Sequence, residues 1–161
     1  MSIIDSLLSL VAPHQCLGCS REGSILCLAC SSQLSATTEY CYYCQRPSKV
    51  GLTCTECYRR AYLFQVRAAT AYRGLAKELV RKLKFSGAQA AVQPMTVAIT
   101  RLLREITTAS AATATTPTER PLVSVIAPVP TVTVRQRRRG YDQACLLARA
   151  LARRQGVGYV P

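Results

Sequence analysis

VSVIAPVPTVTVRQRRRGYDQACLLARALA, residues 123–152, is the segment that decides how the longer part of this chain folds. Its β-branched start stops at Pro128 and Pro130, which cannot donate to a β-ladder, so we expect a buried strand followed by a loop. Asp142 stands where a helix N-cap belongs, ahead of apolar pairs at helical spacing. The segment therefore predicts a strand, a loop and a helix of about residues 142–154.

The loop between the predicted strand and helix is strongly basic. Arg135, Arg137, Arg138 and Arg139 precede Gly140. The free N–H groups and the positive dipole end of the following helix would face the same space as these guanidinium groups. We therefore predict a site for phosphate or pyrophosphate here. A solvated basic loop that binds nothing specific is the alternative interpretation, because runs of arginine are often only solvated surface.

The charge of the chain is unevenly distributed. The 161 residues carry a formal net charge of +13. Residues 1–57 contribute three basic and four acidic side chains, a balance of −1, and the remaining residues contribute 18 basic and four acidic side chains, a balance of +14. The basic character therefore belongs to the second part of the chain, where it would attract nucleic acid, nucleotides or other polyphosphates.

Eight of the nine cysteines occur in CxxC pairs near the start of the chain. These eight are Cys16, Cys19, Cys27, Cys30, Cys41, Cys44, Cys54 and Cys57. A CxxC turn points two sulfurs at one ion, so two turns complete a tetrahedral shell of four thiolates and four turns complete two shells. Sequential pairing of the turns would give two consecutive zinc ribbons, and a crossed pairing is also compatible with the spacing. Neither shell leaves an open position for catalysis.

Zinc is the metal that such thiolate shells favour, and we predict two zinc ions with four cysteine ligands each. Iron–sulfur clusters are the alternative, because thiolates also hold them. Redox-active CxxC is disfavoured, since four tandem copies without alternating strands and helices do not resemble a thioredoxin. His14 lies close enough in sequence to Cys16 to replace a ligand, but eight cysteines already suffice. With few apolar residues between the cysteines, the metal would supply much of the folding free energy, about 10–16 kcal/mol per site.

The start of the chain shows no pattern of export or membrane insertion. Residues 1–11 lack a basic region, a long apolar run and a small-residue cleavage pattern, and no segment of the sequence approaches the length of a membrane span. Residues 2–11 are predicted to form a short amphipathic helix that packs onto the protein. We therefore expect a cytoplasmic protein, in which reduced thiols are available to bind metal.

The residues that follow the cysteines show first a strand pattern and then a helix pattern. Residues 64–72 alternate with a period of two and predict a strand. Residues 75–84 predict a helix whose other face is basic, and a face that is only solvated is one of two open interpretations of that charge. A second helix, with Pro94 in its first turn, is expected to run to about Ile106.

The stretches on either side of the opening segment carry less pattern. Residues 107–121 are rich in threonine and alanine without a periodic apolar face, so we expect a mobile linker. Residues 157–161 have the composition of a strand that begins there. Cys145, the cysteine outside the CxxC pairs, is expected to be a small core residue.

Four short motifs follow one another in an order that this chain shares with a known family. They are Tyr72-Arg73-Gly74, Lys82-Leu83-Lys84-Phe85-Ser86-Gly87, Ala127-Pro128-Val129-Pro130 and Arg139-Gly140-Tyr141-Asp142-Gln143. With the four CxxC pairs, they make the chain resemble the ComF family of amidophosphoribosyltransferase-like proteins, which are associated with DNA uptake and transformation. The resemblance implies an α/β fold, with a double zinc-ribbon module in residues 1–60 and a partial, Rossmann-like phosphoribosyltransferase domain in residues 61–161. The linker 107–121 would lie within this second domain.

The resemblance also implies ligand-binding residues. The family's R-G-F-N-Q turn, which contacts pyrophosphate, would correspond to residues 139–143, with tyrosine in place of phenylalanine and aspartate in place of asparagine. The implied pyrophosphate-binding or anion-binding residues are Arg137, Arg138, Arg139, Gly140, Tyr141, Asp142 and Gln143. Lys82 and Lys84 are second candidates for phosphate contacts. Phosphoribosyl pyrophosphate is the ligand that the family binds.

One part of the family pattern is missing. The phosphoribosyl-binding loop of the family has two acidic residues before Thr-Thr-Gly, and no Asp-Asp pair occurs in the 161 residues. The resemblance places this loop further along than Pro161, so we expect a truncated phosphoribosyltransferase-like domain with little or no transferase activity of its own. Its incomplete sheet would expose strand edges and apolar surface, which a protein partner could cover.

Two other functions are compatible with the sequence. The basic body could bind single-stranded DNA in a salt-dependent way, with tyrosines such as Tyr72 and Tyr141 stacking on bases. The zinc module could instead act as a protein-interaction adaptor without catalysis. The expected partners are thus single-stranded DNA, a phosphorylated small molecule or another protein.

Overall fold

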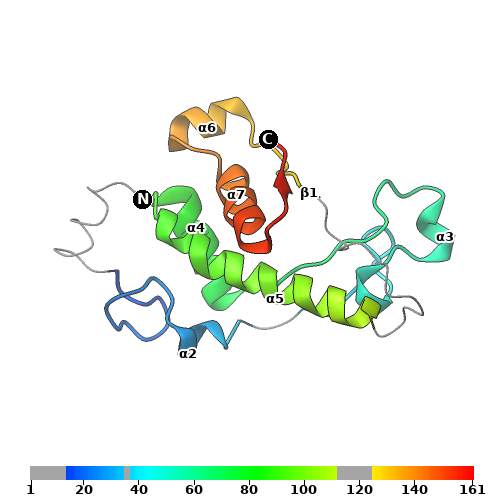
Figure 1. The fold of residues 1–161 in the computed structure, drawn as a ribbon, viewed down its shortest axis with the longest axis horizontal. Helices are drawn as coiled ribbons and strands as arrows, with labels where there is room; N and C mark the ends of the chain where they lie inside the picture. The colour runs from blue at the N-terminus through cyan, green and yellow to red at the C-terminus, as the bar shows by residue number, and fades with distance from the viewer. Residues whose placement is uncertain (1–13, 35–36, 112–124) are drawn as a thin grey trace. The chain divides into compact units, whose positions relative to one another are not determined.

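The computed structural model describes residues 14–34, 37–111 and 125–161, with the backbone alone for residues 106–111 (Figure 1). Its helices and strands are α2 (Leu28–Ser31), the 3-10 helix η1 (Lys49–Gly51), α3 (Thr55–Tyr58), α4 (Gly74–Phe85), the 3-10 helix η2 (Gln89–Ala91), α5 (Val92–Ala111), β1 (Val125–Ile126), α6 (Thr133–Arg139), α7 (Gln143–Gln155) and β2 (Gly158–Tyr159). They fall into two compact units, which we call unit 1 (Met1–Leu34 with Tyr72–Pro161) and unit 2 (Ser35–Ala71). The helix predicted at residues 2–11 lies outside the described residues.

Helix α4 of unit 1 forms where the apolar spacing predicted a helix. It begins at Gly74 and ends at Phe85. Leu79 and Leu83 are almost fully buried, and the lysines and the arginine on the opposite face are exposed. The prediction of an amphipathic helix with an exposed basic face is therefore confirmed.

Helix α5 also forms as predicted, but it is longer than expected. Pro94 occupies its third position, where the missing N–H costs no helical hydrogen bond, and the Thr96 hydroxyl donates to the Val92 carbonyl at 2.7 Å. The helix continues to Ala111 and so includes part of the predicted linker. Threonine and alanine can continue a helix when no proline interrupts them, so the low-complexity composition of residues 107–111 does not end α5. Residues 112–121 of the predicted linker lie outside the described residues.

Two short parallel strands form a sheet at the end of unit 1. Val125 of β1 pairs with Gly158 of β2, and Ile126 pairs with Tyr159. Parallel neighbours need a crossover connection, and helix α7, which packs against α5 and both strands, lies in that connection (Figure 1). Strands thus form before the proline-rich loop and within residues 157–161, as predicted, and the fold combines helices with a two-stranded sheet. The expected burial of the first strand is wrong, because Val125 is 52% exposed and Ile126 is only half-buried.

The arginine-rich segment, predicted as a loop, is a helix. Helix α6 runs from Thr133 to Arg139 and ends at Gly140, whose φ of 79° is the left-handed conformation that glycine favours at helix C-termini. Arginine is a good helix former, so this segment can form a helix in spite of its high charge. Helix α7 then begins at Gln143 with Asp142 as its N-cap, as predicted.

The strand predicted at residues 64–72 does not form. This segment makes one isolated antiparallel bridge, between Gln65 and Leu52, and the apolar side chains of the alternation are mostly exposed. On the polar side of the alternation, Arg67 forms an ion pair with Glu39 at 2.6 Å. The backbone of the segment forms hydrogen bonds with the backbone of residues 51 and 53, and its ion-pair partner Glu39 lies 28 residues away in sequence.

Candidate metal centres and a candidate anion site

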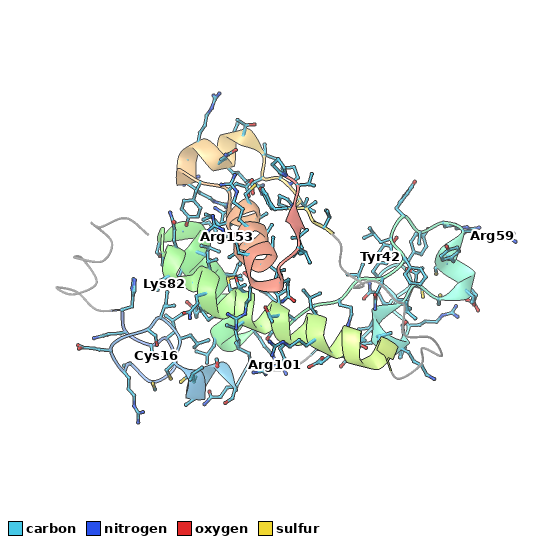
Figure 2. All side chains as sticks on the ribbon, viewed as in Figure 1. Cys16, Tyr42, Arg59, Lys82, Arg101 and Arg153 are labelled. Carbon is cyan, nitrogen blue, oxygen red and sulfur yellow. The ribbon has the colours of Figure 1, made fainter. Side chains whose placement is uncertain are left out.

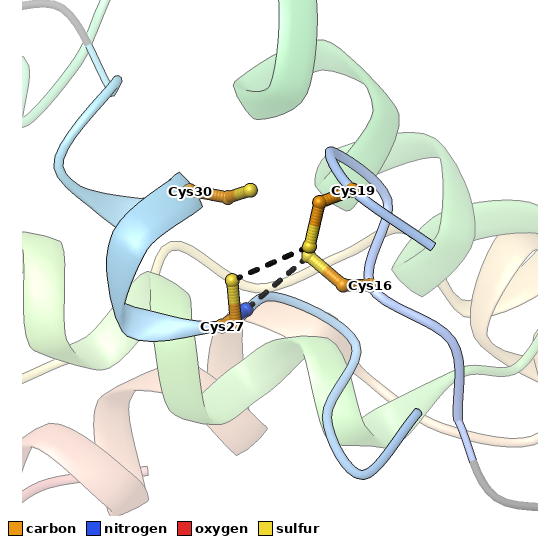
Figure 3. A group of neighbouring side chains, drawn as sticks. All are labelled: Cys16, Cys19, Cys27 and Cys30. Atoms are coloured by element: carbon orange, nitrogen blue, oxygen red, sulfur yellow. Dashed lines mark hydrogen bonds between the residues drawn. The ribbon is translucent and has the colours of Figure 1, made fainter. Parts of the chain in front are cut away.

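Four cysteine sulfurs converge in the first metal-binding group, which consists of Cys16, Cys19, Cys27 and Cys30 (Figure 3). All four sulfurs lie within 4.8 Å of one another, and the Sγ atoms of Cys19 and Cys27 are 3.7 Å apart. A zinc ion with Zn–S bonds of about 2.3 Å has tetrahedral S···S edges of about 3.8 Å. The sulfurs therefore already lie close to the geometry that a metal ion with four thiolate ligands requires.

The second group consists of Cys41, Cys44, Cys54 and Cys57, again with all sulfurs within 4.8 Å of one another. The Sγ atoms of Cys44 and Cys54 are 3.7 Å apart, the same separation as in the first group. The CxxC turns are therefore paired sequentially, and the crossed pairing that the spacing also allowed is wrong. His14 belongs to neither group.

The two metal groups have the same local backbone structure. The N–H of the first cysteine donates to the carbonyl of the arginine five residues later, from Cys16 to Arg21 at 2.8 Å and from Cys41 to Arg46 at 2.9 Å. The residue after each turn has a positive φ, 59° in one group and 61° in the other. The second CxxC pair then opens a short helix, α2 or α3. The groups are thus repeats of one metal-binding fold, and the sequence signal that marks the repeat is Cys-x-x-Cys-x-Arg.

The thiols at opposite ends of each group differ in acidity. The backbone N–H of Cys27 is the main cause that lowers the pKa of Cys16 to about 6. Hydrogen bonding with the Cys27 side chain, followed by burial, raises the pKa of Cys30 to about 12. Cys41 and Cys57 repeat this asymmetry, with pKa values lowered to about 6 by backbone N–H donors and raised to about 12 by a neighbouring cysteine side chain. A divalent cation would favour the ionised form of all four thiols, because it offsets their mutual repulsion.

The first metal group is part of the core of unit 1. Cys16 and Cys30 are buried in one apolar cluster with Leu79 and Leu83 of helix α4. Gly18 lies so close to this cluster that a Cβ atom at its position would be 2.7 Å from the Cys30 Sγ. The first group is therefore attached directly to α4, whereas the second group belongs to unit 2.

The two segments predicted to bind phosphate meet at the end of helix α4. The Tyr141 hydroxyl donates a hydrogen bond to the Leu83 carbonyl, and the Arg139 guanidinium lies over the Phe85 ring, 5.6 Å from its centroid. These contacts bring the exposed lysines of α4, of which Figure 2 labels Lys82, into the same region of unit 1 as the end of α6. We call the set Lys82, Lys84 and Arg137–Gln143 the α4–α6 surface.

The N-terminus of helix α7 is capped from within the chain. The Asp142 carboxylate accepts backbone hydrogen bonds from Thr131 at 2.7 Å, Ala144 at 2.8 Å and Cys145 at 3.1 Å. Burial opposes the ionisation of this carboxyl, but the backbone donors outweigh burial and lower its pKa. Two of the helix-end donors that the sequence offered to a phosphate are therefore occupied by Asp142 itself. Cys145 is half-buried at this helix end.

Of the remaining residues of the predicted turn, some hold the turn by internal hydrogen bonds and others are exposed to solvent. Gln143 is buried, and its side-chain oxygen accepts a hydrogen bond from the Arg139 guanidinium at 2.8 Å. Arg137, Arg138 and Gly140 are exposed. The guanidinium groups of Arg137 and Arg138, together with the lysines of α4, are thus the groups of this surface that an anion can reach.

No protein-family model, curated protein or solved structure matches this chain. Within the described ranges, no helix combines the length and the apolar character needed to cross a bilayer.

Proposed function

We propose that this chain is a ComF-like protein of DNA uptake, related to phosphoribosyltransferases, that binds pyrophosphate groups at the α4–α6 surface and carries two zinc ions. The observation that carries the proposal is the contact between the K-L-K-F and R-G-Y-D-Q segments, made by the Tyr141 hydroxyl and the Leu83 carbonyl. The two residues are 58 positions apart, so nothing local requires these basic segments to meet. Their meeting joins two separate motifs into one anion-binding surface.

Zinc is the proposed metal because both groups are closed sets of four thiolates with tetrahedral separations. Such an ion would supply folding free energy and no catalysis, since four protein ligands leave no open position. The eight cysteines would fix the loops that carry them, and the first group would also fix helix α4.

Each part of the α4–α6 surface has a defined task in this proposal. Arg137 and Arg138 bind pyrophosphate oxygens, Lys82 and Lys84 add positive charge, and Asp142 keeps the turn in place. The family binds ribose with a loop that contains two adjacent acidic residues, and the 161 residues contain no Asp-Asp pair. Binding of pyrophosphate groups is the activity that we propose for the α4–α6 surface.

Calorimetric titration of the zinc-loaded chain with pyrophosphate and with phosphoribosyl pyrophosphate tests this function. The double variant Arg137→Ala/Arg138→Ala should weaken binding by roughly tenfold or more, because it removes two charge-assisted contacts. The matched control is Arg59→Ala/Arg60→Ala, which removes an adjacent exposed pair from unit 2. No pyrophosphate binding, or the same loss in both variants, would contradict the proposal.

A second candidate function is the binding of single-stranded nucleic acid by unit 2. Tyr58, Tyr62 and Phe64 are exposed, and the rings of Tyr58 and Phe64 pack edge to face with centroids 6.3 Å apart. Arg59 and Arg60 are exposed beside them. Unit 2 contains five basic and two acidic side chains, a balance of +3 before thiolates are counted. Exposed aromatic rings beside arginines can stack on bases and contact phosphates.

Binding of a labelled oligonucleotide, followed by fluorescence anisotropy, separates stacking from simple charge attraction. Tyr62→Ala/Phe64→Ala should weaken binding of a thymidine oligonucleotide and leave binding of an abasic strand unchanged. Tyr40→Ala, which removes an exposed tyrosine outside the Tyr58–Phe64 group, is the control. Equal affinity of the original chain for both strands, or weak binding even at low salt, would remove this candidate. If neither pyrophosphate nor nucleic acid binds, the zinc-adaptor prediction remains.

A further inference from the structure

We propose that Cys19 is a site of reversible oxidation by peroxides, which joins it to Cys27 in a disulfide bond and releases the metal ion of the first group. Cys19 is exposed, whereas the other seven cysteines of the two groups are half-buried or buried. Oxidation requires that the peroxide reach the sulfur, so exposure selects Cys19 as the sulfur that reacts first. The release of zinc rests on the metal proposed above, and the disulfide itself does not.

Cys27 is the residue placed to complete the disulfide bond. Its Sγ lies 3.7 Å from the Cys19 Sγ (Figure 3). A disulfide bond is about 2.05 Å long, so the two sulfurs need to approach each other by less than about 2 Å. The other two ligands of the group, Cys16 and Cys30, are only 2% and 4% exposed and belong to the apolar cluster with helix α4. The disulfide bond therefore needs no movement of the two buried sulfurs.

The second group has the same sulfur separation without the same exposure. Its Cys44 and Cys54 sulfurs are also 3.7 Å apart, but both residues are half-buried. Arg46 follows Cys44 by two positions, and Glu56 follows Cys54 by two positions. The two side chains form an ion pair at 2.7 Å. This ion pair therefore joins the two turns that carry the closest sulfurs of the second group.

The first group cannot form the same ion pair. Arg21 stands where the second group has Arg46, but Ala29 takes the place of Glu56 and carries no charge. Cys19 lies within residues 18–23, all of which are exposed. One substitution between the two repeats thus accompanies the difference in exposure, and we assign the oxidation site to the first group alone.

The reaction takes two electrons from two sulfurs and consumes one peroxide. The Cys19 sulfur attacks a peroxide oxygen, the O–O bond breaks, and hydroxide leaves, which gives a sulfenic acid. The Cys27 thiolate then attacks the Cys19 sulfur, the S–S bond forms, and a second hydroxide leaves as the S–O bond breaks. Solvent protonates both hydroxides to water. Cys16 and Cys30 remain as two ligands in place of four, so the metal ion is released.

Treatment of the zinc-loaded full chain with hydrogen peroxide, followed with a chromophoric chelator, tests the proposal. One zinc ion should leave in a fast phase and the second in a slower phase. Peptide mapping by mass spectrometry after the fast phase should find Cys19 joined to Cys27. A dithiol reductant with added zinc should restore the original zinc content, because a disulfide is reversible and a sulfinic acid is not.

Cys19→His and the matched control Cys44→His separate the two groups. Histidine takes the place of one thiolate in structural zinc sites with three cysteines, so both variants should bind two zinc ions. Cys19→His should lose the fast phase, and Cys44→His should keep it. If Cys19→His binds only one zinc ion, Ala29→Glu leaves all eight ligands in place and should slow the fast phase. Glu56→Ala should conversely speed the slow phase.

Three results would overturn the proposal. They are release of both zinc ions at one rate, a disulfide that forms first in the second group, and irreversible oxidation of Cys19 without a disulfide. Zinc content is measured before the oxidant is added, so that failure of the proposed metal is recognised separately. A chain without zinc would contradict that metal alone, and the mapped disulfide would still decide the present inference.

Discussion

Replacement of Cys16 and Cys30 by serine should unfold much more of the protein than replacement of Cys41 and Cys57. Each double variant removes the two buried ligands of one metal group. The first pair shares an apolar cluster with helix α4, whereas the second pair belongs to unit 2. The number of lost thiolates is the same, so the difference between the variants reports what each group holds in place.

The size of the effect follows from two magnitudes. A structural zinc site with four cysteine ligands contributes about 10–16 kcal/mol in apparent terms. A folded domain is stable by only about 5–15 kcal/mol, so loss of the first site is comparable to the whole stability of unit 1. Helices α4, α5 and α7, with 12, 20 and 13 residues, should lose their structure with it. The α-helix of unit 2 is α3, with four residues, so loss of the second site should change the helical signal little.

Far-UV circular dichroism measures this difference, and a chromophoric chelator counts the zinc that each variant retains. We expect Cys41→Ser/Cys57→Ser to lose one zinc ion and keep most of the helical signal, and Cys16→Ser/Cys30→Ser to lose most of that signal. Equal helical signals in the two variants would refute the attachment of the first metal group to α4. Loss of the signal in Cys41→Ser/Cys57→Ser alone would refute it as well.

Three smaller changes test single contacts. Tyr141→Phe removes the hydroxyl that donates a hydrogen bond to the Leu83 carbonyl. It should lower the free energy of unfolding, measured in urea, by about 0.5–1.5 kcal/mol. An unchanged free energy of unfolding would mean that this hydrogen bond does not form in solution. Asp142 has a pKa below its ordinary value of 3.8, so its stabilising contribution is complete above that pH and is lost as the pH falls through the lowered pKa. Asp142→Asn should flatten this part of the stability profile, and an unchanged profile would argue against the N-cap. Gly18→Ala would place a Cβ atom 2.7 Å from the Cys30 Sγ. It should weaken zinc binding at the first group alone, which chelator competition measures. An unchanged zinc affinity would show that the turn accommodates a Cβ atom at this position.

The features that the sequence predicted correctly are those that local spacing encodes. Helix α4 follows from leucines that recur on one face, and Leu79 and Leu83 are indeed buried. The start of α7 follows from Asp142, which caps it as expected. The sets of metal ligands follow from the CxxC pairs, because a two-residue turn places both sulfurs on one side.

The features that the sequence did not predict depend on partners distant along the chain. The alternation of residues 64–72 indicated a strand, but the segment makes one isolated bridge, and its Arg67 pairs with Glu39, 28 residues away. The attachment of the first metal group to helix α4 is invisible to spacing, because it requires Cys16 to pack with Leu79. Helix α6 was not predicted for a different reason. Its four arginines indicated a loop because of their charge, although arginine has a high helix propensity.

Leu83 connects the first metal group to the proposed anion surface. Its side chain lies in the buried cluster with Cys16 and Cys30, and its carbonyl accepts the hydrogen bond from Tyr141. A displacement of α4 that follows loss of the first metal ion would therefore move the acceptor that positions the turn after α6. Coupling of this kind is reciprocal, so an anion that stabilises the α4–α6 surface would also raise the affinity of the first group for its metal. A metal ion held by the first group would thus belong to the framework of the proposed binding surface, in addition to holding its own loop.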